Sequence, residues 1–391
     1  MKLAFVTSVL LTLSLTGCGS SGSSTPGTAS DMCSELSSDT FSCTAMLQDI
    51  TGVAQQTVTS VKTSLLQLDT DIASYCAVQD AASLKTAQDQ WAASMTAVQK
   101  MEVMQFDAID TARDNFYNWP SNDTCKVDLQ IASGLIEDFT KVATGRRGLN
   151  SVEYILFEED TLASCAALYS SVTDWMAVND LAARKKARCD YAKIVTMDLV
   201  RRAGLLETEL STLDLSTKLE SLQLAANSIS DALFYVDKQT KDAKLKAALP
   251  QASDGAFKAT SLESQFAHIS KEHLKNNLLG ARAIFTANDQ TGFEDYLKAA
   301  GQESIATDML TALNAALENL DAIEGDLYTA VSSANDVSAC INATSYAVED
   351  ADIVKVCALQ VSVKAFTDLL KEDFVMVLKF TKPAAADGDN D

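Results

Sequence analysis

The stretch LQDITGVAQQTVTSVKTSLLQLDTDIASY, from Leu47 to Tyr75, decides the fold class. Its larger apolar residues fall along one broad stripe when the chain is drawn as an α-helix. The stripe contains Ile50, Val53, Val58, Val61, Leu65, Leu68 and Ile72. This spacing predicts a long amphipathic helix with one buried face.

Most of the remaining chain repeats the helical period. The segments 80–106 and 179–210 are long helices in this interpretation, with Asp80 and Asp180 as N-caps. Further helices are predicted over 217–235, 261–287, 292–300, 304–332 and 348–380. No stretch alternates over the length of a β-strand, so the pattern predicts an all-α protein of antiparallel helical bundles.

The chain has 391 residues, too many for one ordinary hydrophobic core, which predicts two domains. We place the joint near residues 209–214, between an N-terminal bundle, 32–210, and a C-terminal bundle, 211–382. The main internal loop is 249–261. In the acidic tail, 383–391, Asp387, Asp389 and Asp391 are spaced like the start of a calcium loop, but no bidentate glutamate follows. We interpret the tail as solvated.

Acidic residues outnumber basic ones by 53 to 31, which gives a formal net charge of −22. Such a surface repels nucleic-acid phosphates and anionic lipid heads, and it concentrates small cations. The same surplus also keeps an exported protein soluble without any further role. We therefore expect no nucleic-acid partner.

The first residues have the pattern of a targeting segment. Met1 and Lys2 supply a positive start, the run 3–15 is apolar, and LTGC follows at 15–18. The last four letters resemble a bacterial lipobox, which predicts a signal peptide over 1–17 and a lipid on Cys18; the alternative is an ordinary signal peptide with a stray cysteine. The polar segment 18–31 then reads as a flexible tether. Gly19 in place of aspartate resembles lipoproteins sent to the outer membrane, where the body would face the periplasm.

Eight further cysteines follow Cys18, an even number that suggests disulfides in an exported chain. Their order along the chain suggests the pairs Cys33–Cys43, Cys76–Cys125, Cys165–Cys189 and Cys340–Cys357. None has the C-x-x-C spacing of a zinc or redox centre.

The segment GRRGLNSVEYILF, 145–157, combines charged and apolar residues. On a helix, Arg146, Asn150, Glu153 and Phe157 would form one stripe, and Leu149, Val152 and Leu156 another. Facing solvent, the polar stripe would be ordinary. Facing a second bundle, its charges must pair with each other or bind a ligand.

GLNSVE, 148–153, resembles the imelysin signature G-x-H-x-x-E. Four other segments also resemble that family, so the likeness spans about residues 44–391. They are YCAVQDAASLKTAQDQWAASMTAVQKMEVMQF, NWPSNDTCKVDLQIA, LVRRAGLLETEL and the closing DGDND. It implies two all-helical domains of four-helix-bundle type with the signature in a groove between them. It also implies an exported, often lipid-anchored protein tied to iron uptake. Some members are named metallopeptidases.

The signature histidine is Asn150 here, and the family element FGP reads FDAI at 106–109. An amide is a poor ligand for zinc or iron and cannot act as a general base. We therefore expect no catalytic residues and no peptidase activity.

The residues of the signature predict a binding site. Glu153 could accept from a ligand or coordinate a hard cation, with Glu102 reaching the same groove. Asn150 could orient the ligand, and Trp119 could form the floor. Arg146 and Arg147 could clamp a carboxylate, such as an iron chelator. The alternative is a buried arginine–glutamate pair that locks two helices.

His268 and His273 are five residues apart, about 140° around a helix, so we expect surface or capping roles and no shared metal.

The favoured interpretation is a lipid-anchored envelope protein that binds iron, another divalent cation or a metal chelate during uptake, with an envelope transport partner. The alternatives are a metallopeptidase-like hydrolase and a structural lipoprotein with a vestigial site.

Overall fold

The structure, a computed structural model, describes residues 32–36, 38, 40–121, 123–134, 138–158 and 180–378. These residues belong to one compact unit. Helices and turns connect without any β-strand in the described ranges, which confirms the all-α prediction. The signal peptide, Cys18, the tether, Cys165 and the acidic tail lie outside these ranges. The joint near 209–214 stays a prediction.

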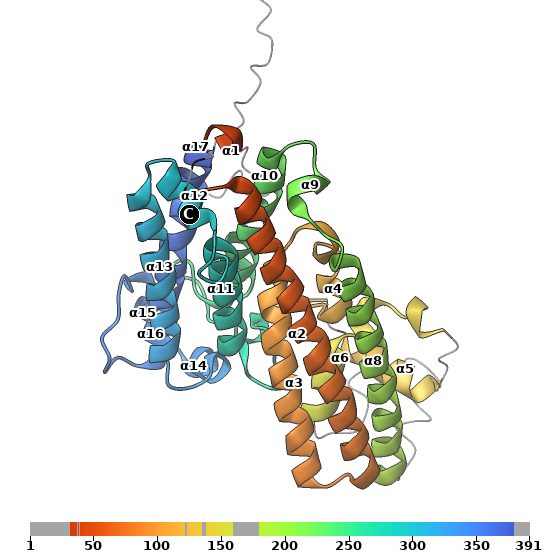
Figure 1. Cartoon of the computed structure of the whole chain (residues 1–391). Helices are drawn as coiled ribbons and strands as arrows, with labels where there is room; N and C mark the ends of the chain where they lie inside the picture. The colour runs from red at the N-terminus through yellow and green to blue at the C-terminus, as the bar shows by residue number, and fades with distance from the viewer. Residues whose placement is uncertain are drawn as a thin grey trace, which may run out of the picture. The chain divides into compact units, whose positions relative to one another are not determined.

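Three long helices run side by side in the first half of the chain (Figure 1). They are α2 (Cys43–Val78), α3 (Ala81–Glu102) and α8 (Leu181–Leu210). The apolar stripe predicted on the first of them is buried along its whole length. The N-caps Asp80 and Asp180 accept backbone N–H groups of the next turn, as predicted.

The second half of the chain forms a group of helices around the antiparallel pair α13 (Glu303–Ala322) and α16 (Asp352–Leu369) (Figure 1). Helix α11 (Ser270–Thr286) packs against α3 and joins the two groups. Gly280 permits this contact, because a Cβ there would lie 2.5 Å from the carbonyl oxygen of Lys100.

Shorter helical elements complete the described structure. The α-helices are α1 (Met32–Glu35), α4 (Arg113–Phe116), α5 (Thr124–Ser133), α6 (Leu149–Phe157), α9 (Leu215–Lys218), α10 (Leu222–Leu233), α12 (Phe293–Ala299), α14 (Leu327–Ser333), α15 (Ser338–Ile341) and α17 (Val375–Leu378). The 3₁₀ turns are η1 (Asp107–Ile109), η2 (Phe139–Lys141), η3 (Thr144–Arg146), η5 (Lys246–Ala248) and η6 (Ala259–Ser261), and the π-helical segments are η4 (Val236–Ala243) and η7 (Leu370–Phe374).

Several predicted helices are shorter or broken in the structure. The segment 217–235 divides into α9 and α10, the segment 304–332 into α13 and α14, and the segment 348–380 starts at 352 and passes through η7. The helix predicted from residue 261 begins only at Ser270, so that prediction was wrong for 262–269. Ser264 and His268 have φ values of 53° and 57°, which an α-helix cannot contain.

The disulfide prediction was half correct. Cys33–Cys43 and Cys340–Cys357 form as predicted. Cys76 pairs with Cys189, not with Cys125, so two of the four guessed pairs were wrong. The antiparallel packing of α2 and α8 brings the end of one helix to the start of the other, with a Cα–Cα distance of 5.4 Å. Cys125 is also disulfide-bonded.

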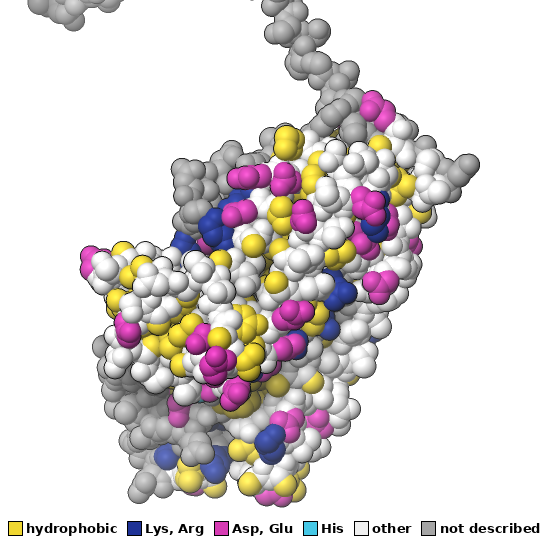
Figure 2. Space-filling model, turned by 90° about the vertical axis from the view of Figure 1, so that its left-hand side faces the viewer, with side chains coloured by type: hydrophobic (Ala, Val, Ile, Leu, Met, Phe, Trp, Pro, Cys, Tyr) yellow, Lys and Arg dark blue, Asp and Glu magenta, His cyan; other side chains and the backbone are white. Residues whose placement is uncertain are grey.

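Acidic side chains are scattered over the face shown in Figure 2, with apolar side chains between them. Within the described ranges, no helix combines the length and the apolar character that a membrane span requires.

Candidate functional site

The signature segment folds differently from the single helix that the sequence predicted. Gly148 is the N-cap of α6. Arg146 is the last residue of the turn η3 and Arg147 follows it, so both arginines lie before the helix. The predicted helical stripe through Arg146 was therefore wrong. A Cβ at residue 148 would lie 2.4 Å from Asn150 Oδ1 and 2.9 Å from the carbonyl oxygen of Phe116, so only glycine fits where the helix starts.

Glu153 is buried, with 1% of its surface exposed, although it is a carboxylate. Its Oε1 accepts hydrogen bonds from Ser264 Oγ at 3.0 Å, Ala267 N at 3.1 Å and Phe266 N at 3.2 Å. Its Oε2 accepts none from the described residues. Burial raises the pKa of Glu153, while these donors and the charge of His273 offset part of the rise.

A cavity of about 570 Å³ opens beside this carboxylate. Tyr117, Trp119 and Phe266 supply aromatic walls, and Glu153 supplies the charge. Thr124, Thr260, Ser261, Ser264 and Gln265 add hydroxyl and amide groups, and no lysine or arginine among the described residues lines it. Burial raises the pKa of Tyr117 well above its usual value, so its phenol stays neutral. The cavity therefore suits a ligand with a hydrogen-bond donor or a positive charge opposite Glu153.

Of the predicted site residues, Glu153 and Trp119 line this cavity and Asn150 does not. Asn150 is 1% exposed and donates from Nδ2 to the carbonyl oxygen of Gly145 at 3.0 Å. Its Oδ1 accepts from Asn118 N at 3.5 Å. The amide that replaces the signature histidine thus fastens η3 and residue 118 to the start of α6.

The two arginines do not join Glu153 either. Arg147 donates from Nη1 to the carbonyl oxygens of Thr140 at 2.9 Å and Phe139 at 3.1 Å. Arg146 is half-buried, and its carbonyl oxygen accepts from Tyr191 OH at 2.6 Å. The predicted carboxylate clamp is therefore not assembled in the Glu153 cavity.

Glu102 belongs to a buried charged network behind the cavity. Its Oε2 accepts from Lys244 Nζ at 2.7 Å and from Tyr235 OH at 2.8 Å. Lys244 Nζ also lies 3.0 Å from Glu263 Oε1, whose other oxygen lies 3.2 Å from His273 Nδ1. Burial would raise the pKa of Glu263, but Lys244 and His273 outweigh it and lower that pKa to about 2.

The described residues contain no group of three or more His, Cys, Asp or Glu side chains arranged to hold a metal ion. Glu102 and Glu153, the predicted metal ligands, are divided between the charged network and the cavity. A metal ion facing Glu153 would therefore need most of its ligands from a chelator or from water.

The histidine prediction was wrong for His273, which is 1% exposed and pairs with Glu263. His268 precedes α11 and stacks on Tyr328 with ring centroids 4.2 Å apart. Sequence reasoning also missed Lys244 and Glu263. A signal in the sequence was the spacing of His273 and Asn277, which lie four residues apart and directly precede Leu274 and Leu278 of the buried face.

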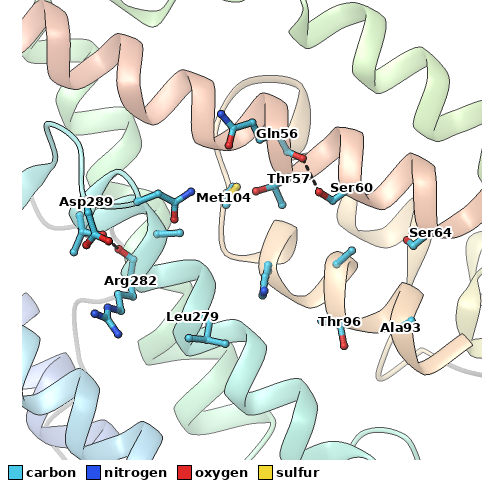
Figure 3. Close-up of a pocket in the computed structure, with 15 residues that line it drawn as sticks. Gln56, Thr57, Ser60, Ser64, Ala93, Thr96, Met104, Leu279, Arg282 and Asp289 are labelled. Carbon is cyan, nitrogen blue, oxygen red and sulfur yellow. Dashed lines mark hydrogen bonds between the residues drawn. The ribbon is translucent and has the colours of Figure 1, made fainter. Parts of the chain in front are cut away.

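A larger cavity of about 710 Å³ lies between α2, α3 and α11 and contains no signature residue (Figure 3). Thr57, Ser60 and Thr286, which line it, donate their hydroxyls to carbonyl oxygens of their own helices. The charged residues of its lining, Lys100, Arg282 and Asp289, are all at least partly exposed. Because the hydroxyls are satisfied and no buried charge among the described residues faces this cavity, the Glu153 cavity is the stronger candidate.

The fold resembles a solved structure described as a putative iron-regulated protein A precursor from Parabacteroides distasonis. The TM-score is 0.53 at 15% sequence identity, and the match covers 83% of this chain and 95% of that chain. At this identity the likeness concerns the fold alone. No curated protein matches. A sequence model of the Imelysin family, peptidase M75, matches residues 54–352, a range that includes the Gly148–Glu153 signature. The chain belongs to the imelysin family.

Proposed function

We propose that this protein is a lipid-anchored cell-envelope binding protein of iron acquisition, and that its ligand enters the Glu153 cavity. One observation carries the proposal. Glu153 is held through Oε1 by three donors from residues 264–267, so that Oε2 remains for a ligand in a cavity with aromatic walls. A carboxylate is costly to bury without a partner, which favours a site that completes itself on binding.

The lining narrows the class of ligand. Since no cationic side chain among the described residues lines the cavity, an anionic group would be repelled by Glu153 without compensation. A hard cation in a chelate, or a hydroxyl or amine of the chelator, would instead pair with Oε2. Trp119 and Phe266 offer flat surfaces for an apolar or aromatic part of the ligand. The similar protein from Parabacteroides distasonis is described as iron-regulated, which supports iron as the cargo.

The proposed location is the periplasmic side of the outer membrane, reached by cleavage after residue 17 and acylation of Cys18. The three described disulfides support an oxidising compartment. If the proposal is correct, Cys18→Ser moves the protein from the membrane fraction to the soluble fraction of the envelope. Retention of the variant in the membrane fraction would contradict it.

Titration of the purified protein with Fe²⁺ tests the binding role. Trp119 lines the cavity, so tryptophan fluorescence reports occupancy. We expect saturable quenching whose apparent Kd rises at least about tenfold in Glu153→Gln, through loss of a charge-assisted contact. Glu220→Gln, an exposed change of the same chemistry, should leave the titration unchanged.

Two other outcomes favour the alternative functions. Peptide cleavage that a chelator abolishes would favour a metallopeptidase, even though Asn150 gives this protein no general base at the signature position. A Glu153→Gln variant that changes the melting temperature while neither protein binds iron would favour a structural lipoprotein. Asn150→His adds a comparison, since tight metal binding only in that variant would show that the natural protein has lost a metal role.

A further inference from the structure

Three arginines converge on one carboxylate at the side of α8. Asp198 Oδ1 accepts from Arg201 Nη2 at 2.6 Å and Nε at 3.2 Å. Its Oδ2 accepts from Arg202 Nε at 2.8 Å and from Arg202 Nη2. Arg147 Nη1 lies 3.8 Å from the same Oδ2. We call Arg147, Arg201 and Arg202 the arginine cluster.

The arginine cluster carries more positive charge than Asp198 neutralises. Burial lowers the pKa of Arg202, and the charges of Arg147 and Arg201 lower it further against the opposing effect of Asp198. Among the described residues that line the adjoining cavity, Glu209 is the one carboxylate, and it is exposed. A local positive surplus therefore persists in a chain whose formal net charge is −22.

The cluster borders an open cavity of about 340 Å³ between α8 and the segment around η1 and α4. Arg201 is the accessible member, with 48% of its side chain exposed, whereas Arg147 and Arg202 are 12% and 9% exposed. Arg147 Nε is buried and finds no acceptor among the described residues. Thr111 and Thr140 add hydroxyl groups to the lining.

The geometry points to a second binding site in this cavity, for a small oxyanion of carboxylate or phosphate type. A guanidinium group can bind two oxygens of either anion in the same bidentate geometry. Asp198 accepts from the Nε and Nη2 of Arg201 with one oxygen only, Oδ1, so it does not itself form this bidentate pair. The anion binds on the open side of Arg201 and draws on the charge of Arg147 and Arg202 behind it. This site contains Arg147 but neither Glu153 nor Trp119, so it does not depend on the proposed iron role.

Calorimetric titration of the whole purified protein with inorganic phosphate and with citrate, at low ionic strength, tests this site. We expect saturable binding of at least one anion, whose relative affinities distinguish the phosphate from the carboxylate class. Arg201→Gln should weaken binding at least about tenfold, because it removes the most accessible fork. Arg201 is half exposed, so the variant should fold.

Lys186→Gln is the matched control, since it removes one positive charge from an exposed position of the same helix outside the cavity. It should bind the anion like the natural protein. Absence of saturable binding by both anions overturns the inference. Equal weakening in Arg201→Gln and Lys186→Gln overturns it as well, since net charge alone would then explain the effect.

Discussion

Glu153 and Glu263 are each only 1% exposed, yet their pKa values move in opposite directions. Glu153 accepts from neutral donors on one oxygen, and the effect of burial on its pKa is larger than theirs. Glu263 has Lys244 and His273 as charged or chargeable partners, and their attraction dominates. The difference assigns roles, because a paired carboxylate holds structure together while an under-compensated one can bind a ligand.

Replacement of Glu153 by glutamine should therefore remove the pH-dependent loss of folding stability that the buried carboxylate causes. A raised pKa means that the folded state binds more protons than the unfolded state between the ordinary value of 4.5 and the raised value. The natural protein consequently loses stability as the pH rises through that window. Urea unfolding at several pH values from 4 to 8 should show Glu153→Gln gaining stability relative to the natural protein as the pH rises. A constant difference between the two would contradict the assigned pKa direction.

The segment 262–269 is the element that builds the candidate site, and helical periodicity alone could not identify it. Its sequence continues the apolar pattern of α11, so sequence reasoning extended the helix. The left-handed residues Ser264 and His268 stop the helix and turn the N–H groups of Phe266 and Ala267 toward Glu153. Such a turn is set by contacts with α6, far away in sequence, which local propensity does not contain.

Glu263 holds this segment to the rest of the protein through Lys244 and His273. Glu263→Gln should lower the free energy of unfolding at pH 7 by about 3 kcal/mol, because Lys244 loses one of two buried partners. Since the pKa of Glu263 is lowered to about 2, its contribution is present above the unfolded value of 4.5 and is lost as the pH falls toward 2. Chemical denaturation should therefore show the two proteins converging in acid. Glu318→Gln, an exposed change, should alter neither quantity.

The contact between α11 and α3 gives a prediction with an internal control. Gly280→Ala forces a Cβ to within 2.5 Å of the Lys100 carbonyl oxygen, so we expect a loss of about 1–3 kcal/mol from overpacking. Gly204 lies inside α8 with no atom within 4 Å of the added Cβ. Gly204→Ala should gain about 0.5–1 kcal/mol, since alanine favours the helix. Equal effects in thermal or urea unfolding would contradict the close contact.

For the whole molecule, the sequence predicted what depends on local pattern. The long helices α2, α3 and α8 and the caps Asp80 and Asp180 agree with it, because amphipathic period and capping chemistry act within a few residues. Glu153 and Trp119, two of the predicted site residues, line one cavity, and their binding role stays a prediction. The separation of Arg147 from Glu153 and the burial of His273 could not be predicted, because they depend on which helices meet.

The disulfides illustrate the same limit. Pairing in chain order succeeded where cysteines are 10 or 17 residues apart and failed for Cys76, whose partner is 113 residues away. That bond joins α2 to α8, so it closes a long loop in the unfolded chain. In the chain-entropy view, a disulfide that closes such a loop stabilises the folded state by roughly 4–5 kcal/mol, because it lowers the entropy of the unfolded chain. A disulfide that closes a loop of ten residues contributes about 2.7 kcal/mol.

Replacing Cys76 and Cys189 together by serine should therefore destabilise the protein more than replacing Cys33 and Cys43. We expect the difference in unfolding free energy to be about 2 kcal/mol. Guanidinium unfolding of the two double variants, under oxidising conditions that keep the other bonds intact, measures it. If both variants lost the same free energy, loop closure would not be the source of the stabilisation. The bond between α2 and α8 would then stabilise the protein through packing in the folded state.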